Sequence, residues 1–232
     1  MMKLRILSGG AAQGIVTALA KTLKTETGCD IDGTFSAVGT IKEKLIGGAP
    51  CDLIILSAKL IGELAESGHL APGTVTDLGV VFTGVAVKKG DPLPAIDDAR
   101  AFKGSLLDAR GIYFPDPQRA TAGIHFMHTL DRLGIRDIVA SRLRTYPNGA
   151  TAMREMAKGA EGKAIGVTHI TEINSTPGLT LVGRLPREFE LATMYTLAVN
   201  AKADSPEAAR RFAEILSGKE AGPLRKAAGF ES

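Results

Sequence analysis

Two short stretches of the sequence carry residues suited to binding an anion. The first is Ser8–Gly14, a glycine-rich turn that follows an apolar run and precedes an Ala- and Leu-rich stretch typical of a helix. Backbone N–H groups at a helix N-terminus point outward, and the helix dipole favours negative charge there. The second is the turn around Arg119, whose guanidinium is suited to holding a carboxylate through two parallel hydrogen bonds. We therefore expect an anionic ligand.

A histidine and several hydroxyl groups extend this chemistry. His169 follows the strand-like run Ala164–Thr168. An imidazole there is suited to donating to a carboxylate or to moving a proton near neutral pH, and a purely structural histidine is the alternative. The hydroxyl-bearing residues expected near the ligand are Ser8, Ser36, Thr40, Ser57 and Thr121.

Other kinds of site are not supported by spacing. His125 and His128 share a predicted helix face, but no Cys or carboxylate completes a metal-binding set nearby. Ser8–Gly14 lacks both the Lys-Ser/Thr of a P-loop and the full spacing of a dinucleotide fingerprint, and a simple tight turn is its alternative reading. Cys29 and Cys51 are predicted to be reduced structural thiols. We predict no metal and no cofactor.

Composition limits the class of protein. The chain has 232 residues, 44% hydrophobic and 23% charged, which is enough for two modest domains or one large α/β domain. Aromatic residues are few, Trp is absent and the net charge of +3 is spread along the chain, so nucleic-acid binding is not predicted. No apolar run approaches the ~20 residues of a membrane span. No signal peptide precedes Ser8, which predicts a cytoplasmic protein, or a periplasmic one if a leader was removed.

Strand and helix signals alternate along the chain. Strands are predicted at 4–7, 31–35, 52–56, 80–87, 111–114, 142–146, 164–168 and 179–182, with an extended segment at 188–199; helices are predicted at 11–24, 40–46, 58–67, 121–133, 150–158, 205–217 and 219–228. This alternation predicts an α/β fold with parallel sheets and helical crossovers. The pattern stops at Lys88–Pro92 and restarts, which indicates a second sheet inserted into the first. We predict domain one at 1–82 and 197–232, and domain two at 83–196.

Several local strings resemble one family. They are Ser8–Gly14, Phe35–Thr40, Gly48–Ala58 (GAPCDLIILSA), Asp116-Pro117 with Thr121–Gly123, Ala164–Thr168 and Ala228–Phe230. Together with the element order they resemble the type 2 periplasmic-binding-protein fold, and within it the molybdate/tungstate-binding proteins of ABC importers. The resemblance spans essentially the whole chain, and the GAPCDLIILSA string is its most specific part.

The resemblance implies two α/β domains with a ligand cleft between them, closing on a solute at the strand ends. The family's hydroxyl ligands fall near Ala11 and Val38, which carry no hydroxyl, and a family tyrosine falls at His169. The implied ligand-binding set is Ser8, Gly9, Gly10, Ala11, Ser36, Val38, Thr40, Ser57, Arg119, Thr121, Ala122, Gly149, His169 and Tyr195. The missing hydroxyls favour a small organic carboxylate over molybdate.

Two functions remain open at this point. The first is a solute-binding protein for a small anion, with an ABC permease as partner if the chain is exported. The second is a cytosolic enzyme on the same scaffold, since some relatives isomerise aconitate by moving a proton alpha to a carboxylate. His169 is then the predicted catalytic base and Arg119 the carboxylate clamp. The identity of the ligand and the oligomeric state are not predicted.

Overall fold

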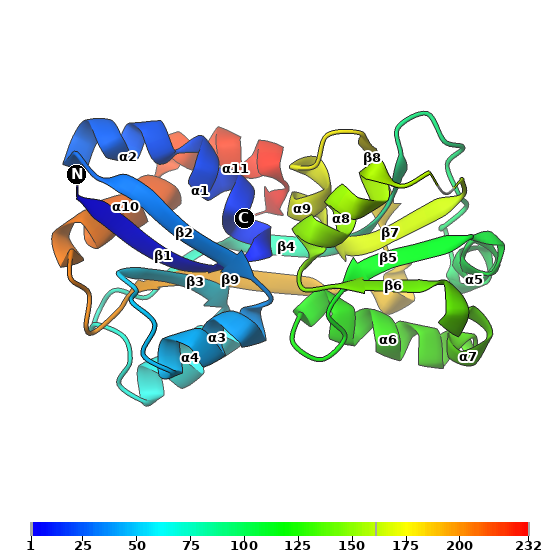
Figure 1. Cartoon of the computed structure of the whole chain (residues 1–232), viewed down its shortest axis with the longest axis horizontal. Helices are drawn as coiled ribbons and strands as arrows, with labels where there is room; N and C mark the ends of the chain where they lie inside the picture. The colour runs from blue at the N-terminus through cyan, green and yellow to red at the C-terminus, as the bar shows by residue number, and fades with distance from the viewer. Residues whose placement is uncertain (1, 161, 232) are drawn as a thin grey trace. The chain divides into compact units, whose positions relative to one another are not determined.

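The computed structural model describes residues 2–160 and 162–231, which form two compact α/β units (Figure 1). Unit 1 runs to Val81 and resumes at Thr193, and unit 2 is Phe82–Ala192. The second crossing between units therefore lies earlier than position 196, where we expected it. The reason is that strand β9 (Ala192–Val199) begins at Ala192 and pairs with unit 1 from Tyr195 onward.

The sheet of unit 1 places its first three strands in parallel. They are β1 (Lys3–Gly9), β2 (Asp30–Ser36) and β3 (Leu53–Ser57), in the order β2-β1-β3, and β9 joins β3 in antiparallel. The two-residue strand β10 (Phe230–Glu231) pairs with the first half of β4 (Thr76–Lys88). The centre of β3 is wholly buried, as expected for a parallel strand covered on both faces.

Helices cover both faces of this sheet. One face carries α1 (Gln13–Ala18), α2 (Ala20–Thr27), α10 (Pro206–Ser217) and α11 (Gly222–Ala228), and the other carries α3 (Val38–Ile46) and α4 (Ala58–Glu66) (Figure 1). Short 3-10 turns, η1 (Gly10–Ala12) and η4 (Lys219–Ala221), precede α1 and α11. The prediction of a single helix at 11–24 is wrong in detail, because the structure has two helices here, α1 and α2. They are divided at Leu19, where ψ is 3° and the side chain turns into the core.

Unit 2 has a second parallel core. β7 (Ala164–His169), β5 (Gly111–Pro115) and β6 (Leu143–Tyr146) lie in the order β7-β5-β6, and the second half of β4 pairs in antiparallel with β7 and with β8 (Leu179–Arg184). The helices are α5 (Ala99–Asp108), α6 (Thr121–Leu133), α7 (Arg136–Val139), α8 (Gly149–Lys158) and α9 (Ile170–Asn174), with turns η2 (Ala140–Arg142) and η3 (Arg187–Phe189).

The sequence patterns missed part of unit 2. Helix α5 begins at Ala99 and is capped by Asp98, whose side chain accepts a hydrogen bond from the Ala101 N–H at 2.8 Å. It was overlooked because two prolines precede it and only Phe102 and Leu106 face the core. The extended segment predicted from 188 is also wrong at its start, because η3 closes a tight turn there. In the described part of the chain, no helix is both long and apolar enough to cross a membrane.

Cys51 makes the stability of unit 1 sensitive to alkaline pH. Cys29 and Cys51 are buried free thiols, which confirms the prediction that both are reduced and structural. Burial raises the pKa of the Cys51 thiol from 9.0 to about 12. Only the unfolded chain then ionises this thiol as the pH passes 9, so its contribution to stability is complete below pH 9 and is lost between 9 and 12.

We expect the free energy of unfolding of the wild type to fall more steeply above pH 9 than that of Cys51→Ala. The difference should approach ~1.4 kcal/mol for each pH unit within this window. Urea unfolding at a series of pH values measures it, and Cys29→Ala is the matched control. Parallel curves for the wild type and Cys51→Ala would contradict the assigned pKa.

Candidate functional site

In unit 1, the strand ends bring several of the predicted residues together. Gly9 at the end of β1 aligns with Ser36 at the end of β2, and Ser57 at the end of β3 aligns with Tyr195 of β9. A Cβ atom at position 9 would lie 2.8 Å from Val38 Cγ1 and 3.0 Å from Tyr195 Cε1. Gly9 therefore permits a close approach that any other residue would prevent. We call Gly9, Ser36, Val38, Ser57 and Tyr195 the unit 1 group.

Helix N-termini begin directly after these strands. Helix α3 starts at Val38 behind Ala37, and α4 starts at Ala58 behind Ser57. Ala37 has only a methyl group, so it cannot cap the first N–H groups of α3. The start of a helix favours negative charge, so the arrangement suits an anion.

The side chains around this edge are partly hydroxyl and partly methyl. Ser8 is wholly buried, and its hydroxyl donates to the Gly9 carbonyl at 2.9 Å. Ser36 and Thr40 are half-buried. Ala11, beside Gly10 in η1, is buried, as is Val38. Hydrocarbon therefore occupies the two positions where the sequence resemblance implies hydroxyls.

In unit 2, a fixed turn carries Arg119. The Asp116 carboxylate accepts hydrogen bonds from the N–H groups of Gln118 and Arg119, at 2.7 and 3.0 Å. These bonds hold the backbone between β5 and α6, and Arg119 itself is exposed. Gly123 lies against the strand end, since a Cβ there would be 2.3 Å from the Asp116 carbonyl oxygen. Thr121 and Ala122 form the first turn of α6.

A second cluster in unit 2 contains a residue that the sequence did not reveal. Glu172 is buried in α9, and its Oε2 accepts a hydrogen bond from Thr168 Oγ1 at 2.5 Å. Its Oε1 accepts from the Ala150 N–H at 3.2 Å, at the start of α8. His169 Nδ1 lies 3.7 Å from Oε2. Gly149 faces the same carboxylate, since a Cβ there would lie 2.0 Å from Oε2.

This cluster changes the interpretation of Gly149. We predicted Gly149 as a ligand contact, but its Cα faces the protein's own carboxylate, which lies at the start of α8. The signal that could have identified Glu172 is its spacing of three and four residues from His169 and Thr168, which places all three near one turn if a helix follows the strand. That helix, α9, has only five residues and was not predicted.

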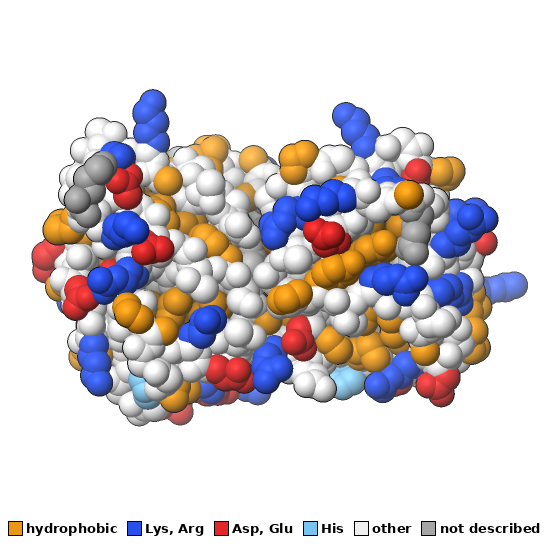
Figure 2. Space-filling view, in the orientation of Figure 1, with side chains coloured by type: hydrophobic (Ala, Val, Ile, Leu, Met, Phe, Trp, Pro, Cys, Tyr) orange, Lys and Arg blue, Asp and Glu red, His pale blue; other side chains and the backbone are white. Residues whose placement is uncertain are grey.

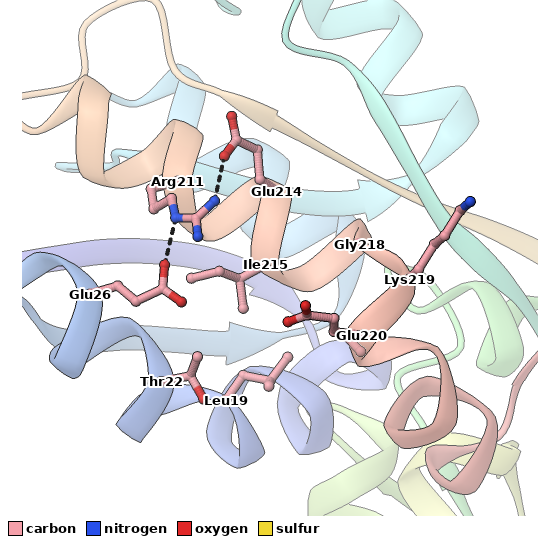
Figure 3. A pocket seen from close by; sticks show the side chains of 10 residues that line it. Leu19, Thr22, Glu26, Arg211, Glu214, Ile215, Gly218, Lys219 and Glu220 are labelled. Carbon is pink, nitrogen blue, oxygen red and sulfur yellow. Dashed lines mark hydrogen bonds and ion pairs between the residues drawn. The ribbon is translucent and has the colours of Figure 1, made fainter.

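A hollow of about 500 Å³ in unit 1 lies between α2 and α10 (Figure 3). Leu19 and Ile215 line it together with Arg211, which hydrogen-bonds to Glu26 at 2.6 Å and to Glu214 at 2.9 Å. These two bonds raise the pKa of the Arg211 guanidinium, and the bond to Glu214 has the larger effect. None of the predicted ligand residues lines this hollow, and its one arginine already pairs with two of its carboxylates, Glu26 and Glu214. We therefore assign the candidate site to the strand ends.

Charges are mixed on the molecular surface. On the face shown in Figure 2, Lys and Arg side chains stand among Asp and Glu side chains. Lys24 pairs with Asp30 at 2.8 Å, and Lys163 pairs with Asp108 at 2.9 Å. Among the residues that the structure describes, no group of three or more His, Cys, Asp or Glu side chains is arranged to hold a metal ion.

Comparison with known proteins identifies the family. The family model described as bacterial extracellular solute-binding protein matches residues 4–231. The chain belongs to this family.

The proteins that this chain is similar to include an enzyme by sequence and a molybdate-binding protein by fold. An aconitate isomerase from a Pseudomonas species is 27% identical over 237 residues, which cover 98% of this chain and 87% of that protein. The periplasmic molybdate-binding protein of Azotobacter vinelandii has a similar structure, with a TM-score of 0.81, 20% identity and 99% of both chains covered. PEB3 bound to L-phospholactate matches with a TM-score of 0.69, 18% identity and 99% of both chains covered.

These comparisons confirm the predicted periplasmic-binding-protein-like α/β fold of the molybdate-binding class. The family is described as extracellular. Of the two locations expected from the sequence, cytoplasmic and periplasmic, this description agrees with the second. The predicted ligand residues themselves stay predictions.

Proposed function

We propose that this solute-binding protein binds a small organic anion and prefers a carboxylate to molybdate. The observation that carries the proposal is the unit 1 group, where Ser36 and Ser57 end strands that lead into α3 and α4, and where the two positions that the resemblance gives to hydroxyls carry the buried hydrocarbon of Ala11 and Val38. A tetrahedral metal oxyanion needs donors on all sides, and each missing neutral hydrogen bond costs it ~1 kcal/mol. An organic acid instead offers carbon atoms to the methyl groups.

Arg119 supports the carboxylate assignment. Its backbone is held by Asp116, and the side chain follows the carboxyl end of β5, the end of a parallel strand where ligands bind in open α/β sheets. A guanidinium binds a carboxylate through two parallel hydrogen bonds. We propose that Arg119 makes this contact, with Thr121 and Ala122 at the start of α6 beside it.

The family favours a cellular location and a partner protein for this chain. Its description as extracellular, and the solved substrate-binding domain of a putative molybdenum ABC transporter that this chain resembles in fold, favour delivery of the solute to an ABC permease. We propose an extracytoplasmic location and a permease partner on this basis.

A thermal-shift screen tests the proposal. Di- and tricarboxylates are expected to raise the unfolding temperature more than molybdate, sulfate or phosphate, because a ligand that binds only the folded state stabilises it by mass action. Arg119→Ala should weaken binding of the best carboxylate by about 30-fold, the loss of one charge-assisted pair worth ~2 kcal/mol.

Arg110→Ala is the matched control, since Arg110 is an exposed arginine at the opposite end of β5. It should leave the affinity unchanged. A shift from molybdate alone would refute the carboxylate assignment, and equal losses in the two variants would refute the role of Arg119.

Isomerisation of a carboxylate is the second candidate function. It is favoured by the similarity to an aconitate isomerase over 98% of this chain. In this reaction His169 would accept the proton from a carbon alpha to a carboxylate and return it to another carbon as the double bond moves. Incubation of each binding acid in deuterated water, followed by NMR, tests it. Deuterium incorporation that is lost in His169→Gln supports catalysis, whereas an unchanged acid supports binding alone.

A further inference from the structure

We propose that Glu172 is a positioning residue that fixes which nitrogen of the His169 ring carries the proton, namely Nδ1. The inference rests on the proposed function only in assigning His169 to the ligand. It starts from a carboxylate that neither the sequence patterns nor the comparisons single out. The Glu172 side chain is 5% exposed and that of His169 is 6% exposed, so water does not compete for their contacts.

The partners of Glu172 determine its hydrogen-bonding role. The Ala150 N–H donates to Oε1 at 3.2 Å, and the Thr168 hydroxyl donates to Oε2 at 2.5 Å. Both partners are donors, and a carboxylate is an acceptor only. Gly149 gives the carboxylate room, because a Cβ at this position would lie 2.0 Å from Oε2 and 1.9 Å from Thr168 Oγ1.

The ring nitrogen that faces this acceptor is Nδ1, 3.7 Å from Oε2. In a neutral imidazole one nitrogen is a donor and the other an acceptor, and the neighbouring groups select the tautomer. A carboxylate oxygen favours N–H on the nitrogen that it faces. The neutral His169 ring therefore carries its proton on Nδ1 and keeps the lone pair on Nε2.

This tautomer of His169 limits the chemical groups of a ligand that the ring can bind. A lone pair on Nε2 accepts a hydrogen bond from a hydroxyl group, or takes up a proton, and it repels a carboxylate oxygen. The neutral His169 ring thus selects an acid that carries a hydroxyl group. Arg119 remains the proposed contact for the carboxylate itself.

The test is the nitrogen NMR spectrum of the His169 ring in protein without ligand. In 15N-labelled wild type the Nδ1–H form of the neutral ring is expected to predominate over the Nε2–H form, and His169→Gln assigns the signal by its loss. In Glu172→Gln the amide oxygen is retained by the Ala150 N–H, so the NH2 group faces Thr168 and Nδ1. The NH2 group is a donor, so the tautomer should reverse to Nε2–H.

Thr168→Val is the matched control. It removes one donor to Glu172 and leaves the carboxylate that faces His169, so Nδ1–H should persist. A predominant Nε2–H form in the wild type, or no change in Glu172→Gln, would overturn the inference. Thermal unfolding of each variant shows that the folded state is compared in every case.

Affinities for malate and succinate, which differ by one hydroxyl, test the consequence. The wild type should prefer malate about tenfold, the value of one hydrogen bond, and Glu172→Gln should reduce this preference because Nε2–H donates to carboxylates. Equal affinities in the wild type would overturn the predicted selectivity. If neither acid nor any other carboxylate binds, the proposed function fails, and the ring spectra still decide the role of Glu172.

Discussion

Replacement of Asp52 by alanine is expected to lower the free energy of unfolding by about 3 kcal/mol, because it leaves two partly buried N–H donors without an acceptor at ~1–3 kcal/mol each. Asp52 is 1% exposed. Its Oδ2 accepts from the Arg5 N–H in β1 at 2.8 Å, and its Oδ1 accepts from the Ser205 N–H at the start of α10 at 2.9 Å. One side chain thus joins β1, β3 and α10.

Asp204→Ala is the control for this prediction. Asp204 forms an exposed ion pair with the Arg5 side chain, so its removal should cost less than ~1 kcal/mol. Asp52→Asn should fall between the two, because its amide oxygen can serve only one of the two N–H groups well. Urea unfolding compares the three variants. Equal costs for Asp52→Ala and Asp204→Ala would show that Asp52 does not join these elements.

The second large effect is expected from Gly149→Ala, which should destabilise unit 2 by about 3 kcal/mol, at the upper end of the cost of overpacking. The new methyl group would meet Thr168 Oγ1 at 1.9 Å and Glu172 Oε2 at 2.0 Å. Both groups are buried, so neither can move away without losing a hydrogen bond. We also expect weaker carboxylate binding, because His169 depends on the same cluster.

The same substitution at Gly104 should change the free energy of unfolding in the opposite direction. Gly104 is exposed within α5, and a Cβ there has no neighbour within 4 Å. Alanine is favoured over glycine in a helix by up to ~1 kcal/mol, so Gly104→Ala should stabilise unit 2. Thermal or urea unfolding measures both variants. Destabilisation by both would indicate that the crowding at Gly149 is not the cause.

The sequence was sufficient to predict the parallel strands, and the reason is physical. Strands β1, β3 and β5 are short apolar runs with a glycine- or proline-containing turn at one end, so their local pattern and their buried location agree. Helix α6 (Thr121–Leu133) was predicted to start near Thr121 and to end at Leu133, because its apolar face is regular and Gly134 ends it in a left-handed conformation. Helices α7 and α9 are too short to show a period.

The candidate site was predictable only where strand ends define it. Gly9, Ser36 and Ser57 follow apolar runs that lie side by side, so a parallel sheet brings them to one edge. Glu172 could not be recognised in this way, because it does not end a strand and its partner Ala150 belongs to α8, so that their contact is tertiary. Asp52, within the most specific string of the family resemblance, proves to hold elements together in unit 1.

The discontinuous course of unit 1 has a consequence for how the chain folds during synthesis. Unit 2 is one continuous stretch, Phe82–Ala192, whereas unit 1 needs strand β9, where Val199 pairs with Leu53. The ribosome therefore releases the whole of unit 2 before the last strand and helices of unit 1 exist. Contacts between such distant residues form slowly, since a long loop must close first. Unit 1 stays incomplete until the end of translation, with the edge of β3 unpaired and open to non-native pairing.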